Sequence, residues 1–192
     1  MKKLRSFAGV IVCIVSLMLA AACGSTTTIK TNKGTLEVSE SGNEVSFNSE
    51  DGETKIKSSN DNKDVVIETK DADGKSVSTQ FSESNDVPEE LPAHIPIPDN
   101  AKISSSIKSE SDGTNTVMVM YNVEIAADAL QKLYSDYIKD KGYSDTFDMS
   151  SEEFVMVSGN LEEGSLAVAA APNSDNSKTF DVTLTWTDSA AK

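Results

Sequence analysis

Few side chains in this chain could do chemistry by themselves. The sequence holds two cysteines, Cys13 and Cys23, and a single histidine, His94. A lone histidine works as a catalytic base only beside an orienting carboxylate and a nucleophile, and no spacing in the sequence supplies them. We therefore expect His94 to be a surface or partly packed residue. We also expect no metal ion or other cofactor, and a chain that is not an enzyme.

The first 22 residues have the layout of an export signal. Lys2, Lys3 and Arg5 precede a run from Phe7 to Ala22 that carries no charge. A positive start, an apolar centre and small residues before a cleavage point are typical of a secretory signal. A helix of this length would reach about 24 Å, whereas the hydrocarbon core of a bilayer is about 30 Å thick, so an uncleaved membrane span is disfavoured.

The end of this run, Leu19-Ala20-Ala21-Ala22-Cys23, resembles the lipobox of bacterial lipoprotein precursors. The resemblance implies that residues 1–22 are a lipoprotein signal peptide, cut between Ala22 and Cys23. It also implies that Cys23 carries a diacylglycerol anchor with fatty-acyl chains such as palmitate. Two acyl chains hold a protein firmly on a bilayer, whereas one gives reversible attachment. We expect the protein on the extracytoplasmic face of the cell membrane, with residues 23–28 as the lipidated cysteine and a flexible spacer.

The charge of the chain limits its partners. The formal net charge is −14, and it becomes −17 once Lys2, Lys3 and Arg5 leave with the signal peptide. Phosphate backbones and anionic lipid head groups repel such a chain, so we expect no nucleic-acid partner and a membrane link made by the lipid. The expected partner is an envelope protein or a cell-wall polymer, and the oligomeric state stays open.

Residues 29–87 predict a β-meander. Apolar residues alternate with polar ones in short segments separated by Gly, Asn and Asp turns. The segments expected as strands are 26–30, 35–39, 44–48, 53–57, 65–69 and 76–81. Large apolar residues are few, so an ordered meander and a partly disordered segment are both open, and the agreement between alternation and turns favours the meander.

Two oxygen-rich stretches in this part could suggest calcium sites. Asp71-Ala72-Asp73-Gly74 resembles part of an EF-hand loop, but Thr69 and Gln80 stand where the anchoring carboxylates of such a loop would be. Residues 60–64 carry a lysine among their oxygens. We interpret both stretches as hairpin turns.

Residues 88–100 are rich in proline and predict a stiff, extended linker between two domains. Residues 101–188 predict the better-folded domain, with two strands, a helix at 126–141, and four more strands. The helix is expected from an apolar stripe at helical spacing that includes Leu130, Tyr134 and Ile138. The expected fold class is α+β, with a β-meander followed by one helix packed on an antiparallel sheet.

The proline-rich stretch from Leu91 to Ile103 and the helix end from Tyr134 to Tyr143 resemble a group of uncharacterised small lipoproteins of Gram-positive bacteria. The resemblance covers about residues 90–187. It implies a surface-anchored α+β domain and no known activity.

Two functions follow from these features as expectations. The first is a membrane-anchored envelope lipoprotein that presents a non-catalytic binding domain. The alternative is a binder of small apolar ligands, with a cleft between the helix and the sheet lined by Met118, Met120, Tyr134 and Tyr137. Against the alternative, such residues usually fill a core.

Overall fold

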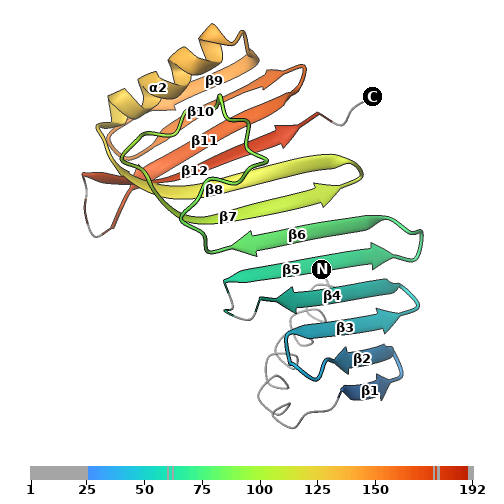
Figure 1. Cartoon of the computed structure of the whole chain (residues 1–192). Coiled ribbons are helices and arrows are strands. Elements are labelled where there is room, and N and C mark those ends of the chain that lie inside the picture. Colours follow the sequence, from blue (N-terminus) through green and yellow to red (C-terminus); the bar gives the residue numbers. More distant parts are fainter. Residues whose placement is uncertain (1–25, 60, 62, 175, 177, 190–192) are drawn as a thin grey trace. The chain divides into compact units, whose positions relative to one another are not determined.

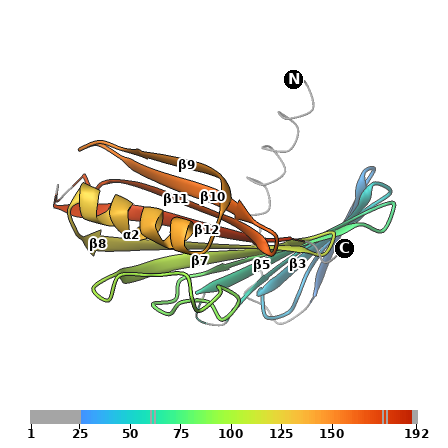
Figure 2. The ribbon, with the colours of Figure 1, turned by 90° about the horizontal axis from the view of Figure 1, so that it is seen from above.

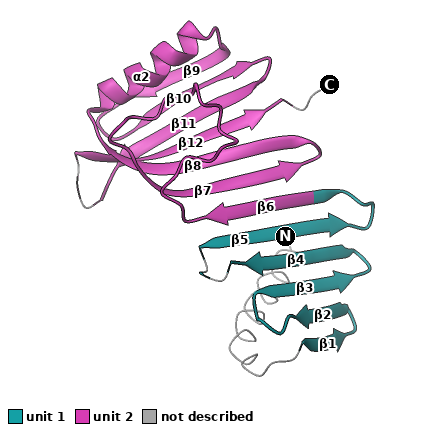
Figure 3. Cartoon of the chain, viewed as in Figure 1, with its two compact units in different colours: residues 1–76 teal, residues 77–192 magenta. Residues whose placement is uncertain are grey.

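The computed structural model describes residues 26–59, 61, 63–174, 176 and 178–189. These residues form twelve strands and one helix, α2 (Figure 1). They divide into two compact units, the first ending at Ser76 and the second beginning at Val77 (Figure 3). Within the described part of the chain, no helix has the length and apolar character needed to span a membrane.

The first unit is an antiparallel meander of five strands. Each strand pairs with the next one along the chain. The strands are β1 (Thr27–Thr31), β2 (Gly34–Val38), β3 (Glu44–Ser49), β4 (Gly52–Ser58) and β5 (Asp64–Asp71). Its buried apolar cluster is small: Leu36, Val38 and Val45 are buried, and Ile29 and Phe47 pack against them. A single sheet layer with so little apolar burial gains its stability mainly from its ladders and turns.

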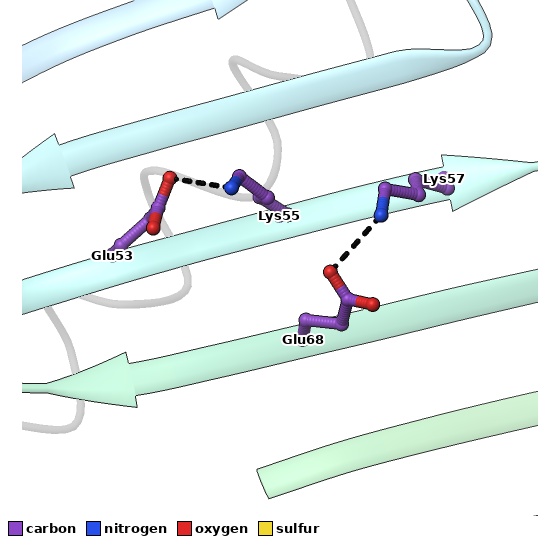
Figure 4. Close-up of polar contacts among 4 residues, drawn as sticks. All are labelled: Glu53, Lys55, Lys57 and Glu68. Atoms are coloured by element: carbon purple, nitrogen blue, oxygen red, sulfur yellow. Dashed lines mark hydrogen bonds and ion pairs between the residues drawn. The ribbon is translucent and has the colours of Figure 1, made fainter. Parts of the chain in front are cut away.

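Turn chemistry and alternation explain why this meander forms. Gly52 has a φ of 137°, and a Cβ there would lie 2.1 Å from the carbonyl oxygen of Lys70. Only glycine fits that turn. One face of β4 and β5 carries charges: Lys55 Nζ lies 3.0 Å from Glu53, and Lys57 Nζ lies 3.1 Å from Glu68 (Figure 4). The carboxylate of Glu53 raises the pKa of Lys55 by its hydrogen bond and its charge.

The second unit is an antiparallel sheet with strand order β6-β7-β8-β12-β11-β10-β9. Its strands are β6 (Ser76–Ser82), β7 (Lys102–Ser111), β8 (Thr114–Glu124), β9 (Ser144–Ser150), β10 (Val155–Leu161), β11 (Gly164–Pro172) and β12 (Thr179–Asp188). The last strand of the chain, β12, therefore lies between β8 and β11 in the middle of this sheet. Strands β10 and β9 follow outward, which leaves β9 at the end of the order.

One face of this sheet holds the main core. Its buried residues include Val119, Tyr121, Leu184, Val168 and Val155, one position in two along each strand. Helix α2 (Ala127–Asp140) lies against β10 and β9 (Figures 1 and 2). It buries Leu130, Tyr134 and Ile138. We call this side of the sheet the covered face.

The ends of α2 follow helix chemistry. Asp128 lies in the first turn, where the helix dipole favours an anion, and its side chain accepts the N–H of Ala129. At the other end Gly142 has a φ of 74°, and the Tyr143 N–H donates to the carbonyl of Ile138. Glycine adopts this left-handed conformation without steric cost, so the helix stops there.

Residues 83–101 form a segment, here called the strap, that covers more of the same face. Leu91 and Ile95 are buried in the cluster that contains the α2 and sheet residues. The expectation that residues 88–100 are extended was wrong. The N–H groups of Leu91, Ile95 and Ala101 donate to the carbonyls of Pro88, Pro92 and Pro98, three residues back in each case. Proline restrains itself and the residue before it, and the residues after it are free to turn. The strap lies wholly within the second unit.

The predicted fold class, α+β, was also wrong, because the described chain is dominated by strands. The described residues form twelve strands and a single helix of 14 residues. The helix spans only β9 and β10, so it cannot cover a seven-stranded sheet. The strap covers part of the sheet face that a second helix would cover in an α+β fold.

Candidate functional site

The opposite side of the second sheet, here called the outer face, is where its accessible side chains gather. Paired residues in neighbouring strands point to the same face, so the register defines rows across the sheet. One row contains Met149, Met156, Ala169, Thr183 and Met120. A second row contains Phe147, Ser158, Ala167, Thr185, Met118 and Ile107. The face is mostly small, apolar or hydroxyl-bearing.

The β9 end of this face exposes large apolar groups. Phe147, Met149 and Met156 are 44, 43 and 44% exposed. Met149 and Met156 are direct cross-strand partners, and Phe147 lies two residues from Met149 on the same face. Together they form what we call the edge patch. A folded protein gains nothing in stability from leaving such groups in water, so the edge patch is a candidate interaction site.

The four residues predicted to line an apolar cleft do not come together. Met118 and Met120 lie on the outer face, because they alternate in β8 with the buried Val117, Val119 and Tyr121. Tyr134 is fully buried on the covered face.

The hydroxyl of Tyr134 lies 2.5 Å from that of Tyr121 in the packed interface between helix and sheet. Burial raises the pKa of Tyr121 to about 12 and raises the pKa of Tyr134 still further, so both phenols are neutral at physiological pH.

Tyr137, the fourth predicted residue, belongs to a small aromatic and ionic cluster. The His94 ring meets the Tyr137 ring edge-on at 6.1 Å, and the Tyr137 hydroxyl lies 3.4 Å from that of Tyr143. His94 Nε2 lies 3.7 Å from a carboxylate oxygen of Glu163. Burial, followed by the contact with Tyr137, raises the pKa of Tyr143. This arrangement can hold the strap in two places. The His94 ring packs on Tyr137 of α2, and a protonated His94 would form an ion pair with Glu163 in the turn after β10.

The two oxygen-rich stretches of the first unit serve as turns where they are described. Asp71 accepts the N–H of Lys75 at 2.9 Å, and Asp61 accepts hydrogen bonds from Ser59 and Lys63. These bonds lower the pKa of Asp61. Among the residues with described positions, no group of three or more His, Cys, Asp or Glu side chains could hold a metal ion. The predicted lipidation site Cys23 and the cleavage position Ala22 lie outside the described residues.

Sequence reasoning missed the edge patch. The alternation of Asp148 with Phe147 and Met149 is visible in the sequence, but the position of this strand at the end of the strand order is not. Comparison with protein-family models, with curated proteins and with solved structures finds no match to this chain.

Proposed function

We propose that this protein is a lipid-anchored envelope protein on the extracytoplasmic side of the cell membrane, whose folded part binds a partner without catalysing a reaction. The observation that carries the proposal is Cys23 directly after Leu19-Ala20-Ala21-Ala22, at the end of an uncharged run that begins after Arg5. Such a segment directs export of the chain, and a diacylglyceryl group on the cysteine keeps the exported protein on the bilayer.

Two features of the described fold support binding over catalysis. His94 contacts a carboxylate and an aromatic ring edge, an arrangement that suits attachment of the strap. The outer face instead offers exposed apolar groups on a regular sheet, which suits contact with another molecule. The high negative charge directs such contacts toward neutral or basic partners.

The test is metabolic labelling with an alkyne analogue of palmitate in a bacterium that processes lipoproteins. We expect the label on the wild-type chain and none on the Cys23→Ser variant. The matched control is Cys13→Ser, because Cys13 lies within the segment that is expected to be removed, and this variant should label like the wild type. A wild-type chain without label, or a Cys23→Ser variant that keeps it, contradicts the proposal.

A further inference from the structure

Strand β9 ends the strand order of the second sheet. Among the described residues it pairs with β10 and with no other strand. Six of its seven residues are exposed. One edge of β9 therefore presents backbone N–H and C=O groups that the ladder does not use, and an extended segment can add to such an edge as a new strand.

This edge is held in place by polar contacts from α2. Gln131 bridges two residues of β9: its Nε2 donates to Asp148 at 2.5 Å, and its Oε1 accepts the hydroxyl of Ser150 at 2.5 Å. The hydroxyl of Ser135 donates to the second oxygen of Asp148. The strand is thus fixed by groups that lie on its covered side, so an added strand would meet an edge that is already ordered.

The two sides of β9 differ in chemistry. On the outer face, Phe147 and Met149 are exposed beside Met156. On the other side, Asp148 has neutral hydrogen-bond partners, Gln131 and Ser135. A strand added here would place alternate side chains beside these two surfaces, one apolar and one anionic.

The wider region carries charge of one sign. Residues 142–177, which include β9, β10 and β11, contain no lysine, arginine or histidine. Asp145, Glu152 and Glu153 are exposed next to the edge. A second copy of this chain would bring the same carboxylates against these, which is unfavourable for directly opposed strands. Charge complementarity selects a basic occupant.

We propose that β9 is the docking edge for an extended segment of a partner protein in which basic and apolar residues alternate. The segment adds a strand to the sheet, with its apolar side chains beside Phe147 and Met149 and its basic side chains toward Asp148. The proposal rests on the proposed function, because it names the partner class of the binding domain.

The experiment uses the full chain in a non-ionic detergent and follows backbone amide exchange by mass spectrometry. The probe is a capped heptapeptide in which lysine and valine alternate, and the control peptide carries glutamate in place of lysine. We expect the lysine peptide to slow exchange over residues 144–150 and the glutamate peptide to leave it unchanged. Titration followed by fluorescence of a dye on the peptide gives the affinity.

The variant Phe147→Lys removes an apolar group and adds a positive charge at the edge. We expect it to weaken binding of the lysine peptide by about tenfold or more. Its matched control is Phe81→Lys on β6, since Phe81 is 40% exposed and lies on a different strand. Circular dichroism of both variants checks that they fold.

Four results would overturn the proposal. They are equal binding by the Phe147→Lys variant, equal binding of the two peptides, slowed exchange away from residues 144–150, and protection of 144–150 that grows with protein concentration in the absence of peptide. The last result would identify a second copy as the occupant. None of them bears on acylation of Cys23, so failure here is distinguishable from failure of the proposed function.

Discussion

The hydroxyl groups of Tyr121 on β8 and Tyr134 on α2 lie 2.5 Å apart, and both side chains are buried. This hydrogen bond joins the helix to the sheet inside an otherwise apolar interface, where each hydroxyl has the other as its partner. Removing one of them leaves the second buried without a partner, which costs more than removing both.

We predict that Tyr134→Phe lowers the free energy of unfolding of the second unit by about 1–3 kcal/mol. The double variant Tyr121→Phe/Tyr134→Phe should lose clearly less than the two single variants added together. Urea unfolding of the wild type and the three variants gives the coupling energy. Additive losses would show that the two hydroxyls do not act as a pair.

The same pair predicts sensitivity to alkali. Burial raises the pKa of Tyr121 from 10.0 to about 12 and raises that of Tyr134 as well, so the unfolded chain releases these protons at lower pH than the folded chain. Their stabilising contribution is complete below pH 10 and is lost as the pH rises toward 12. The free energy of unfolding should fall in this window by up to about 1.4 kcal/mol per pH unit for each tyrosine.

Urea unfolding at pH 8, 10 and 11 measures this slope. The control is the double variant Tyr121→Phe/Tyr134→Phe, which should fall less steeply. Some slope should remain, because burial also raises the pKa of Tyr143. An unchanged slope in the double variant would contradict the assignment.

The strap should contribute to the stability of the second unit. Leu91 and Ile95 are buried in the main core, at 4 and 5% exposure. Changing either to alanine should cost about 2–5 kcal/mol, since each leaves a cavity. Val87→Ala is the matched control, because Val87 lies in the strap at 45% exposure and should change stability little. Small and equal effects of the three substitutions, measured by thermal unfolding, would mean that the strap is not part of the core.

The contacts of Asp148 should position β9. Asp148→Ala removes the acceptors for Gln131 and Ser135, so β9 should detach more often from α2 while the main core persists. Amide exchange over residues 144–150 should become faster, with little change in the unfolding midpoint. Glu152→Ala, in the exposed turn after β9, is the control and should exchange like the wild type. Equal exchange in both variants would refute a positioning role.

Local signals in the sequence were sufficient to locate the elements. Each of the first six strands, β1 to β6, begins within one residue of its expected start, since alternation and turn glycines such as Gly52 are local features. The helix stripe through Leu130, Tyr134 and Ile138 is also local, and the helix lies at 127–140 where 126–141 was expected.

The predictions that were wrong concern contacts between residues that are distant in the sequence. The prolines of residues 88–100 predicted an extended segment, whereas the segment turns and buries Leu91 and Ile95 against the sheet. The apolar character of these two residues is visible in the sequence, but the turns that seat them are not. Met118 and Met120 were assigned to a cleft with Tyr134, although period-two alternation with Tyr121 places them on the other face. Strand β9 lies at the end of the strand order, and His94 lies near Glu163. Both facts depend on segments that are far apart in the sequence, and no sequence pattern predicts that they meet.

Our central proposal is that a lipid on Cys23 fastens the folded units outside the cell. The most direct measurement is mass spectrometry of the N-terminal peptide of the protein purified from the membrane fraction. We predict a peptide that begins at Cys23 and carries a diacylglyceryl group with its acyl chains. A peptide that begins at Met1, or one with a free thiol at Cys23 in protein recovered from the medium, would contradict the claim.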